Sequence, residues 1–194
     1  MRDRRWVPAL AVALLLPGTA AAADESPPAG RSLTVSGMAG QGFLQQPGHG
    51  FSEFASAFVG LAKPSSRHIE LRLELYPVFL VRQPRVTSDA SRETVSALAV
   101  DFGLRWFTRP PGPRARPYVE LLAGPLYGFR HIPEPGSAFN FLVQLAGGAI
   151  LPVGSRARLV AAYRWIHISN AGTSHYNPSW NYSTLELGNR WEYP

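Results

Sequence analysis

The chain has 194 residues, of which 45% are hydrophobic and 11% aromatic, so one folded domain is expected rather than a disordered chain. It has no cysteine and only five scattered histidines, which excludes a disulfide framework and a cysteine nucleophile and argues against a zinc site. The net charge of +6 comes from arginines dispersed singly along the chain, a pattern that argues against nucleic acid as a partner.

Residues 1–23 have the composition of a secretory signal peptide. Arginines at positions 2, 4 and 5 precede an apolar run, Trp6 to Leu16, which is too short to cross a bilayer as a helix. Ala21 and Ala23 provide the small residues of a cleavage site. We therefore expect residues 24–194 to form the mature domain, with a polar tail up to about Gly30.

The rest of the chain has the period of β-strands, not of helices. Stretches of about ten residues alternate apolar and polar positions and are separated by turn-forming residues, the pattern of an antiparallel barrel. The prediction is an all-β, eight-stranded antiparallel transmembrane β-barrel. Its strands are expected near residues 32–43, 51–61, 69–75, 98–106, 119–129, 139–145, 158–169 and 182–193.

The polar faces of these strands carry charges of both signs, which we expect to neutralise one another inside the narrow barrel. They are Glu70, Arg72, Glu74, Asp101, Arg105, Glu120, Arg164, Glu186 and Arg190. Aromatic residues gather near the expected strand ends, where an interfacial girdle is predicted. These are Tyr76, Trp106, Phe107, Tyr118, Tyr127, Trp165, Trp191 and Tyr193.

Four segments rich in Pro, Arg, Ser and Gly are predicted to connect strands. They are residues 82–93, 109–116, 131–137 and 152–155.

One histidine and one serine have the spacing of a base and a nucleophile. His167 and Ser169 are two residues apart on an expected strand, so their side chains share a face, about 6.6 Å apart at the Cα atoms. Tyr163 and Trp165 belong to the same apolar face. The pair is therefore expected to face lipid, an expensive place for polar groups unless the substrate itself lies in the membrane.

The C-terminal half resembles the outer-membrane lipid A 3-O-deacylases of the PagL family. The resemblance rests on Arg116 to Gly124, Ala138 to Phe141 and, above all, the His167-Ile-Ser-Asn-Ala-Gly172 motif. It implies that Ser169 is the nucleophile and His167 the general base and acid. It also implies an oxyanion site formed by Asn170, Gly172 and Asn177.

The resemblance fails at the third catalytic position, where the family has a glutamate and this chain has Asn181. Asparagine can orient an imidazole but does not stabilise an imidazolium as a carboxylate does. We expect Asn181 to take the orienting role in a weaker or differently tuned hydrolase. Glu186 has the wrong parity to replace it, and His175 and Glu53 are outside candidates.

The expected function is hydrolysis of the 3-O-linked hydroxyacyl ester of lipid A in the outer membrane of a Gram-negative cell, without metal or organic cofactor. Lipopolysaccharide and membrane lipid are the expected partners, and both termini are expected in the periplasm. Three alternatives stay open: a phospholipase-like esterase, a non-catalytic structural barrel and a soluble periplasmic barrel. Assembly as a homodimer is also left open.

Overall fold

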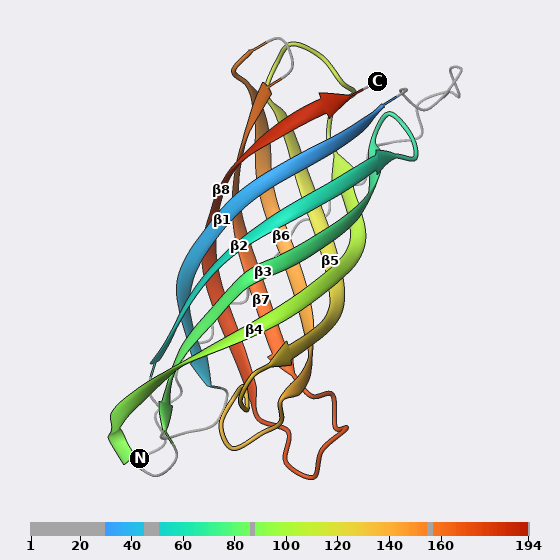
Figure 1. The fold of residues 1–194 in the computed structure, drawn as a ribbon. Coiled ribbons are helices and arrows are strands. Elements are labelled where there is room, and N and C mark those ends of the chain that lie inside the picture. Colours follow the sequence, from blue (N-terminus) through green and yellow to red (C-terminus); the bar gives the residue numbers. More distant parts are fainter. Residues whose placement is uncertain (1–29, 45–50, 86–87, 155–156, 194) are drawn as a thin grey trace, which may run out of the picture.

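The computed structural model describes residues 30–44, 51–85, 88–154 and 157–193, and these form eight β-strands. Each strand pairs with the next in antiparallel fashion, and β1 pairs with β8, which closes the barrel (Figure 1). The strands are β1 (Arg31–Leu44), β2 (Phe51–Pro64), β3 (Ile69–Arg85), β4 (Ser88–Phe107), β5 (Arg116–Gly128), β6 (Phe139–Pro152), β7 (Ala157–Ser169) and β8 (Ser179–Tyr193).

The predicted fold class and number of strands are confirmed. Within the part of the chain that the structure describes, no helix has the length and hydropathy needed to cross a bilayer. The predicted signal peptide, residues 1–23, lies outside the described residues.

The interior of the barrel is filled with charged side chains. All nine charged residues predicted to face the lumen are buried. Arg164 lies at their centre, with nitrogen–oxygen distances of 2.6 Å to Glu186, 2.9 Å to Glu120 and 3.1 Å to Glu74. The predicted interior network is therefore confirmed, and the pairing offsets the cost of removing these charges from water.

Three aromatic residues assigned to the interfacial girdle point into the barrel instead. Tyr76, Phe107 and Tyr118 are buried, and the Tyr76 hydroxyl donates a hydrogen bond to Glu74. The reason is strand parity, because Tyr76 follows Glu74 by two residues and Tyr118 precedes Glu120 by two. Tyr127, Trp165 and Tyr193 do lie on the outer surface.

The connection predicted at residues 82–93 is also wrong, because β3 continues to Arg85 and β4 begins at Ser88. Gln83 pairs with Glu93 in the register of the two strands, and its side chain donates to Glu93 and to the His131 carbonyl. Charged residues and Pro84 hide the alternation here. Strand ends that extend beyond the lipid need no apolar outer face, so hydropathy does not reveal them.

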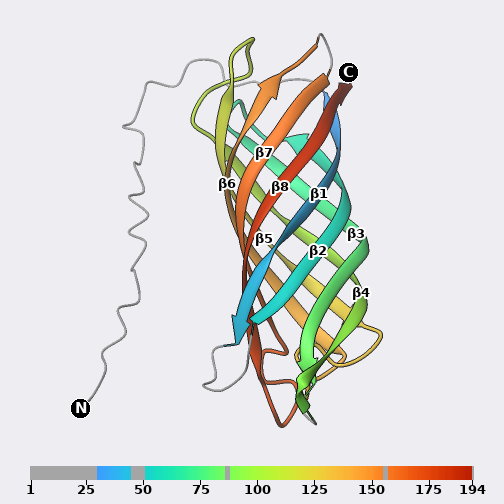
Figure 2. The same ribbon diagram turned by 90° about the vertical axis from the view of Figure 1, so that its left-hand side faces the viewer.

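The barrel has two distinct ends (Figures 1 and 2). At the terminal end, β1 begins, β8 ends, and residues 65–68 and 108–115 connect strands. At the opposite end, which we call the loop end, residues 129–138 and 170–178 form the two longest described connections. The polar groups described next lie at the loop end, where β7 ends and β8 begins.

Candidate active site

His167, Ser169 and Asn181 meet on the outer wall of the barrel. β7 and β8 are antiparallel neighbours, and their register places His167 opposite Asn181 and Ser169 opposite Ser179. Ile166 and Ile168 are buried in the core, so the alternating residues His167 and Ser169 point outward. The predicted outward orientation of the pair is thus confirmed.

The three side chains form a continuous chain of hydrogen bonds. His167 Nδ1 lies 2.9 Å from Asn181 Oδ1, and His167 Nε2 lies 3.1 Å from Ser169 Oγ. An amide oxygen can only accept, so Nδ1 carries the proton and donates to Asn181. This tautomer leaves the lone pair of Nε2 free to accept the serine proton, which is the state that a general base requires.

The three side chains differ in their exposure to solvent. Asn181 is 3% exposed, whereas His167 and Ser169 are partly exposed on the surface of the wall. The buried amide fixes the ring from behind, and the hydroxyl is the member that an incoming molecule can reach. Such an order suits an attack on a substrate that approaches the wall from outside.

Trp165 is a further component of this site, and the sequence motif did not point to it. Its indole ring stacks on the imidazole of His167, with ring centroids 5.9 Å apart and an angle of 21° between the ring planes. The two residues share the outer face of β7, so their i, i+2 spacing was the available signal. An aromatic face at this distance stabilises a cation on the neighbouring ring.

Neither of the two acids considered as substitutes for Asn181 bonds to His167. Glu186 lies inside the barrel, where it accepts hydrogen bonds from Arg164 and Ser36. Glu53 is exposed on β2 and pairs with Arg82 and Arg92. His175, the third outside candidate, is exposed in the loop after β7.

The loop after β7 is organised by the side chain of Asn170, which is fully buried. Its Oδ1 accepts a hydrogen bond from the Gly172 N–H at 3.0 Å, and its Nδ2 donates to the Tyr176 carbonyl at 2.7 Å. The Asn170 N–H donates to Asn177 Oδ1 at 3.0 Å. Two backbone N–H groups of the expected oxyanion region are therefore used inside the loop.

The backbone of this loop turns through the left-handed region at two consecutive residues. Ala171 has φ of 52° and Gly172 has φ of 79°. Gly172 adopts this conformation without strain, whereas a residue with a Cβ does so at a cost. The tight turn directs the segment away from β7 immediately after Ser169.

The surface around the site is apolar. Large hydrophobic side chains are exposed on the outer faces of β6, β7 and β8, and Phe139 contacts Phe141 edge to face at 5.3 Å. The exposed members near the site include Phe139, Leu145, Tyr163, Trp165 and Leu185. No group of three or more His, Asp or Glu side chains suited to a metal ion occurs among the described residues.

A family model described as "Lipid A 3-O-deacylase (PagL)" matches residues 80–190, a range that contains His167, Ser169 and Asn181. No curated protein matches the chain.

Among solved structures, the outer membrane protein OprG from Pseudomonas aeruginosa is 11% identical with a TM-score of 0.57, and the match covers 85% of this chain and 96% of OprG. Neisserial surface protein A is 11% identical with a TM-score of 0.56, covering 84% and 97%. The outer membrane enzyme PagL is 16% identical with a TM-score of 0.53, covering 80% and 97%. At these identities the likeness shows a shared fold, that of outer-membrane barrels.

Proposed function

The chain belongs to the PagL family of lipid A 3-O-deacylases, and we propose that it hydrolyses the ester of the 3-O-linked hydroxyacyl chain of lipid A. The observation that carries this proposal is the hydrogen-bonded chain from Asn181 through His167 to Ser169 on the outer wall. It supports an activated serine, and its position on an apolar outer face supports a lipid substrate.

The proposed reaction begins when Ser169 Oγ attacks the ester carbonyl and His167 Nε2 takes the hydroxyl proton. Asn181 Oδ1 holds the Nδ1 proton throughout, so the ring keeps its tautomer and orientation. His167 then returns the proton to the leaving sugar oxygen, which gives 3-O-deacylated lipid A and an acyl-serine. Attack by water on the acyl-serine, again assisted by His167, releases the 3-hydroxy fatty acid and restores Ser169.

We propose that the loop between β7 and β8 supplies the hydrogen-bond donors that stabilise the oxyanion, and that Asn177 is the principal donor. Asn177 is exposed, and because its Oδ1 accepts the Asn170 N–H, its Nδ2 group is directed elsewhere as a donor. The Gly172 N–H could contribute only after it exchanges Asn170 Oδ1 for the substrate oxygen. Such a change would couple substrate binding to a small shift of the loop.

The direct test is mass spectrometry of lipid A from a Gram-negative host that expresses the full chain. Loss of one 3-hydroxyacyl group is expected with the natural sequence and with Ser183→Ala, a matched control whose serine lies on the same outer face of β8. Ser169→Ala should leave lipid A intact. The Ser183 hydroxyl contacts Tyr163 and not His167, so its removal leaves the proposed machinery unchanged.

Two other functions give different results in the same experiment. A phospholipase-like esterase would leave lipid A intact but produce lysophospholipids that depend on Ser169. A structural barrel would change neither lipid although the protein is correctly inserted. Insertion is established separately, from the shift in electrophoretic mobility on heating that folded barrels show.

A further inference from the structure

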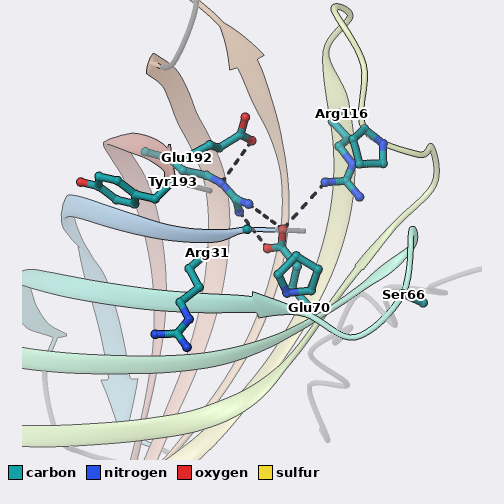
Figure 3. Close-up of a pocket in the computed structure, with 10 residues that line it drawn as sticks. Arg31, Ser66, Glu70, Arg116, Glu192 and Tyr193 are labelled. Carbon is teal, nitrogen blue, oxygen red and sulfur yellow. Dashed lines mark hydrogen bonds and ion pairs between the residues drawn. The ribbon is translucent and has the colours of Figure 1, made fainter. Parts of the chain in front are cut away.

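The terminal end of the barrel contains a cavity that the proposed hydrolysis does not use (Figure 3). It has a volume of about 130 Å³, and its lining includes Arg31, Glu70, Arg116, Arg190 and Glu192. A smaller cavity of about 40 Å³ adjoins it and shares Pro111, Arg116 and Glu192. Arg114 and Arg158 line this second space.

Positive charge is in excess in these two cavities. Five arginines line them, against two glutamates. Glu70 is already held by Arg190, with nitrogen–oxygen distances of 2.6 and 2.8 Å, and Arg116 approaches it at 3.8 Å. Glu192 is shared between Arg158 at 3.4 Å and Arg190 at 3.8 Å. Both acids are therefore engaged, and a net positive charge remains.

Two of the arginines have no acid partner within the described part of the chain, namely Arg31 and Arg114. Arg31 extends from β1 with its guanidinium turned away from Glu70 (Figure 3). Ser32 and Thr34 are buried in the lumen, so parity places Arg31 on the outer side of the wall. Arg114 is exposed in the connection between β4 and β5.

The loop end shows the opposite arrangement, although it too carries exposed arginines. Arg82 and Arg92 pair with Glu53, and Arg85 and Arg130 pair with Glu93. Among the described residues, the exposed arginines of the loop end are thus paired with acids, whereas Arg31 and Arg114 at the terminal end are not. The chain has 18 arginines and one lysine, but this general excess of arginine does not account for the difference between the two ends.

The cavity wall is held in shape by Arg116. Its Nε donates to the Arg109 carbonyl at 3.0 Å and one terminal nitrogen donates to the Arg67 carbonyl at 2.7 Å, which ties together two connections of the terminal end. The guanidinium also lies 3.4 Å from the centroid of the Phe107 ring. Arg190 Nε makes no hydrogen bond there but lies 3.8 Å from Glu192 Oε1. The wall is therefore preorganised.

We propose that these two adjoining cavities, which we call the mouth of the barrel, bind the phosphate group of an anionic phospholipid in the leaflet that surrounds the terminal end. Guanidinium groups fit phosphate through paired hydrogen bonds, and unpaired arginines at a membrane surface attract anionic headgroups. Arg31 faces the lipid and also lines the cavity, so a headgroup beside β1 can reach the mouth while its acyl chains stay in the bilayer.

The test uses the full-length protein in nanodiscs of phosphatidylcholine that contain a small fraction of phosphatidylglycerol. Native mass spectrometry after release counts the phosphatidylglycerol that each barrel retains. The double variant Arg31→Gln/Arg114→Gln is compared with Arg82→Gln/Arg130→Gln, which removes two exposed arginines from the loop end. Folding of each is verified by its mobility shift on heating.

The natural sequence and the loop-end variant are expected to retain the lipid, whereas Arg31→Gln/Arg114→Gln should bind it about 10- to 30-fold more weakly. Retention should fall as the salt concentration rises and should survive millimolar inorganic phosphate. Equal retention by both variants would overturn the proposal. Displacement of the lipid by inorganic phosphate would overturn it as well, because the cavity would then be a site for small free anions.

Discussion

Asn181 has two effects on the proposed reaction, one on the orientation of His167 and one on its charge. It holds the imidazole in the tautomer that a base needs, but as a neutral amide it does nothing for the positive charge that His167 gains during attack. A carboxylate in its place would supply a negative charge that stabilises the imidazolium. The structure therefore suggests a site with correct geometry and weakened electrostatics.

Replacement of Asn181 should separate these two contributions. Asn181→Ala is expected to lower kcat for lipid A deacylation by about 10²-fold, because the ring is no longer held in place. Asn181→Glu should raise kcat above that of the natural sequence, since a carboxylate stabilises the imidazolium. Asn189→Ala, on the outer face of the same strand, should have no effect. A fully active Asn181→Ala variant would show that another group orients His167.

Trp165 offers partial compensation for the missing charge. Its ring stacks on that of His167, and an aromatic face stabilises a neighbouring cation by about 0.5 to 2 kcal/mol. Trp165→Leu should therefore lower kcat about 2- to 30-fold, whereas Trp165→Phe should retain most of the activity. Equal activity of the Leu and Phe variants would mean that the stack has no part in catalysis.

At the scale of elements, the β7–β8 loop depends on one buried side chain. The Asn170 side chain accepts a hydrogen bond from the Gly172 N–H and donates one to the Tyr176 carbonyl. Asn170→Ala should lose the loop geometry without unfolding the barrel, because the strands do not use these bonds. Deacylase activity should fall by about 10²- to 10³-fold, the cost of one lost oxyanion donor.

The matched control for this loop is Ser174→Ala, which lies in the same connection. It should keep both activity and the heating shift of the folded barrel. If Asn170→Ala behaved like Ser174→Ala, the loop would have no role in holding the substrate.

The strands themselves are tied together by the interior charges. Arg164 on β7 contacts Glu74 on β3, Glu120 on β5 and Glu186 on β8. Arg164→Met should lower the free energy of unfolding by about 3 to 5 kcal/mol, because buried carboxylates lose their partner. Urea unfolding in lipid vesicles would measure this. Arg82→Met, which removes an exposed ion pair, should cost about 1 kcal/mol or less.

For the whole molecule, the sequence was sufficient to predict the barrel because strand alternation and lumen charges survive in almost every strand. It failed where that signal is absent. The β3 and β4 strands continue as charged segments around Gln83. An aromatic residue near a strand end is typical of the girdle, but strand parity places Tyr76, Phe107 and Tyr118 inside the barrel. The His167 and Ser169 pair could be predicted from spacing. The stack of Trp165 and the loop bonds of Asn170 depend on side-chain geometry that spacing does not determine.

The two proposed sites would bring each end of the molecule into contact with a different lipid. The loop end presents the hydrogen-bonded serine on an apolar wall, and the terminal end presents unpaired arginines at the barrel mouth. The two longest described connections, residues 129–138 and 170–178, lie at the loop end, which agrees with the rule that the long loops of outer-membrane barrels are extracellular. That orientation would place the proposed active site in the leaflet that contains lipopolysaccharide.

Covalent trapping would show whether Ser169 is a nucleophile that His167 activates. The folded protein in micelles is treated with a long-chain alkyl fluorophosphonate, and the modified peptide is identified by mass spectrometry. We predict one adduct per chain on Ser169, unchanged in Ser183→Ala and absent in His167→Ala. A folded, correctly inserted protein that forms no adduct on Ser169, or forms it equally fast in His167→Ala, would contradict the claim.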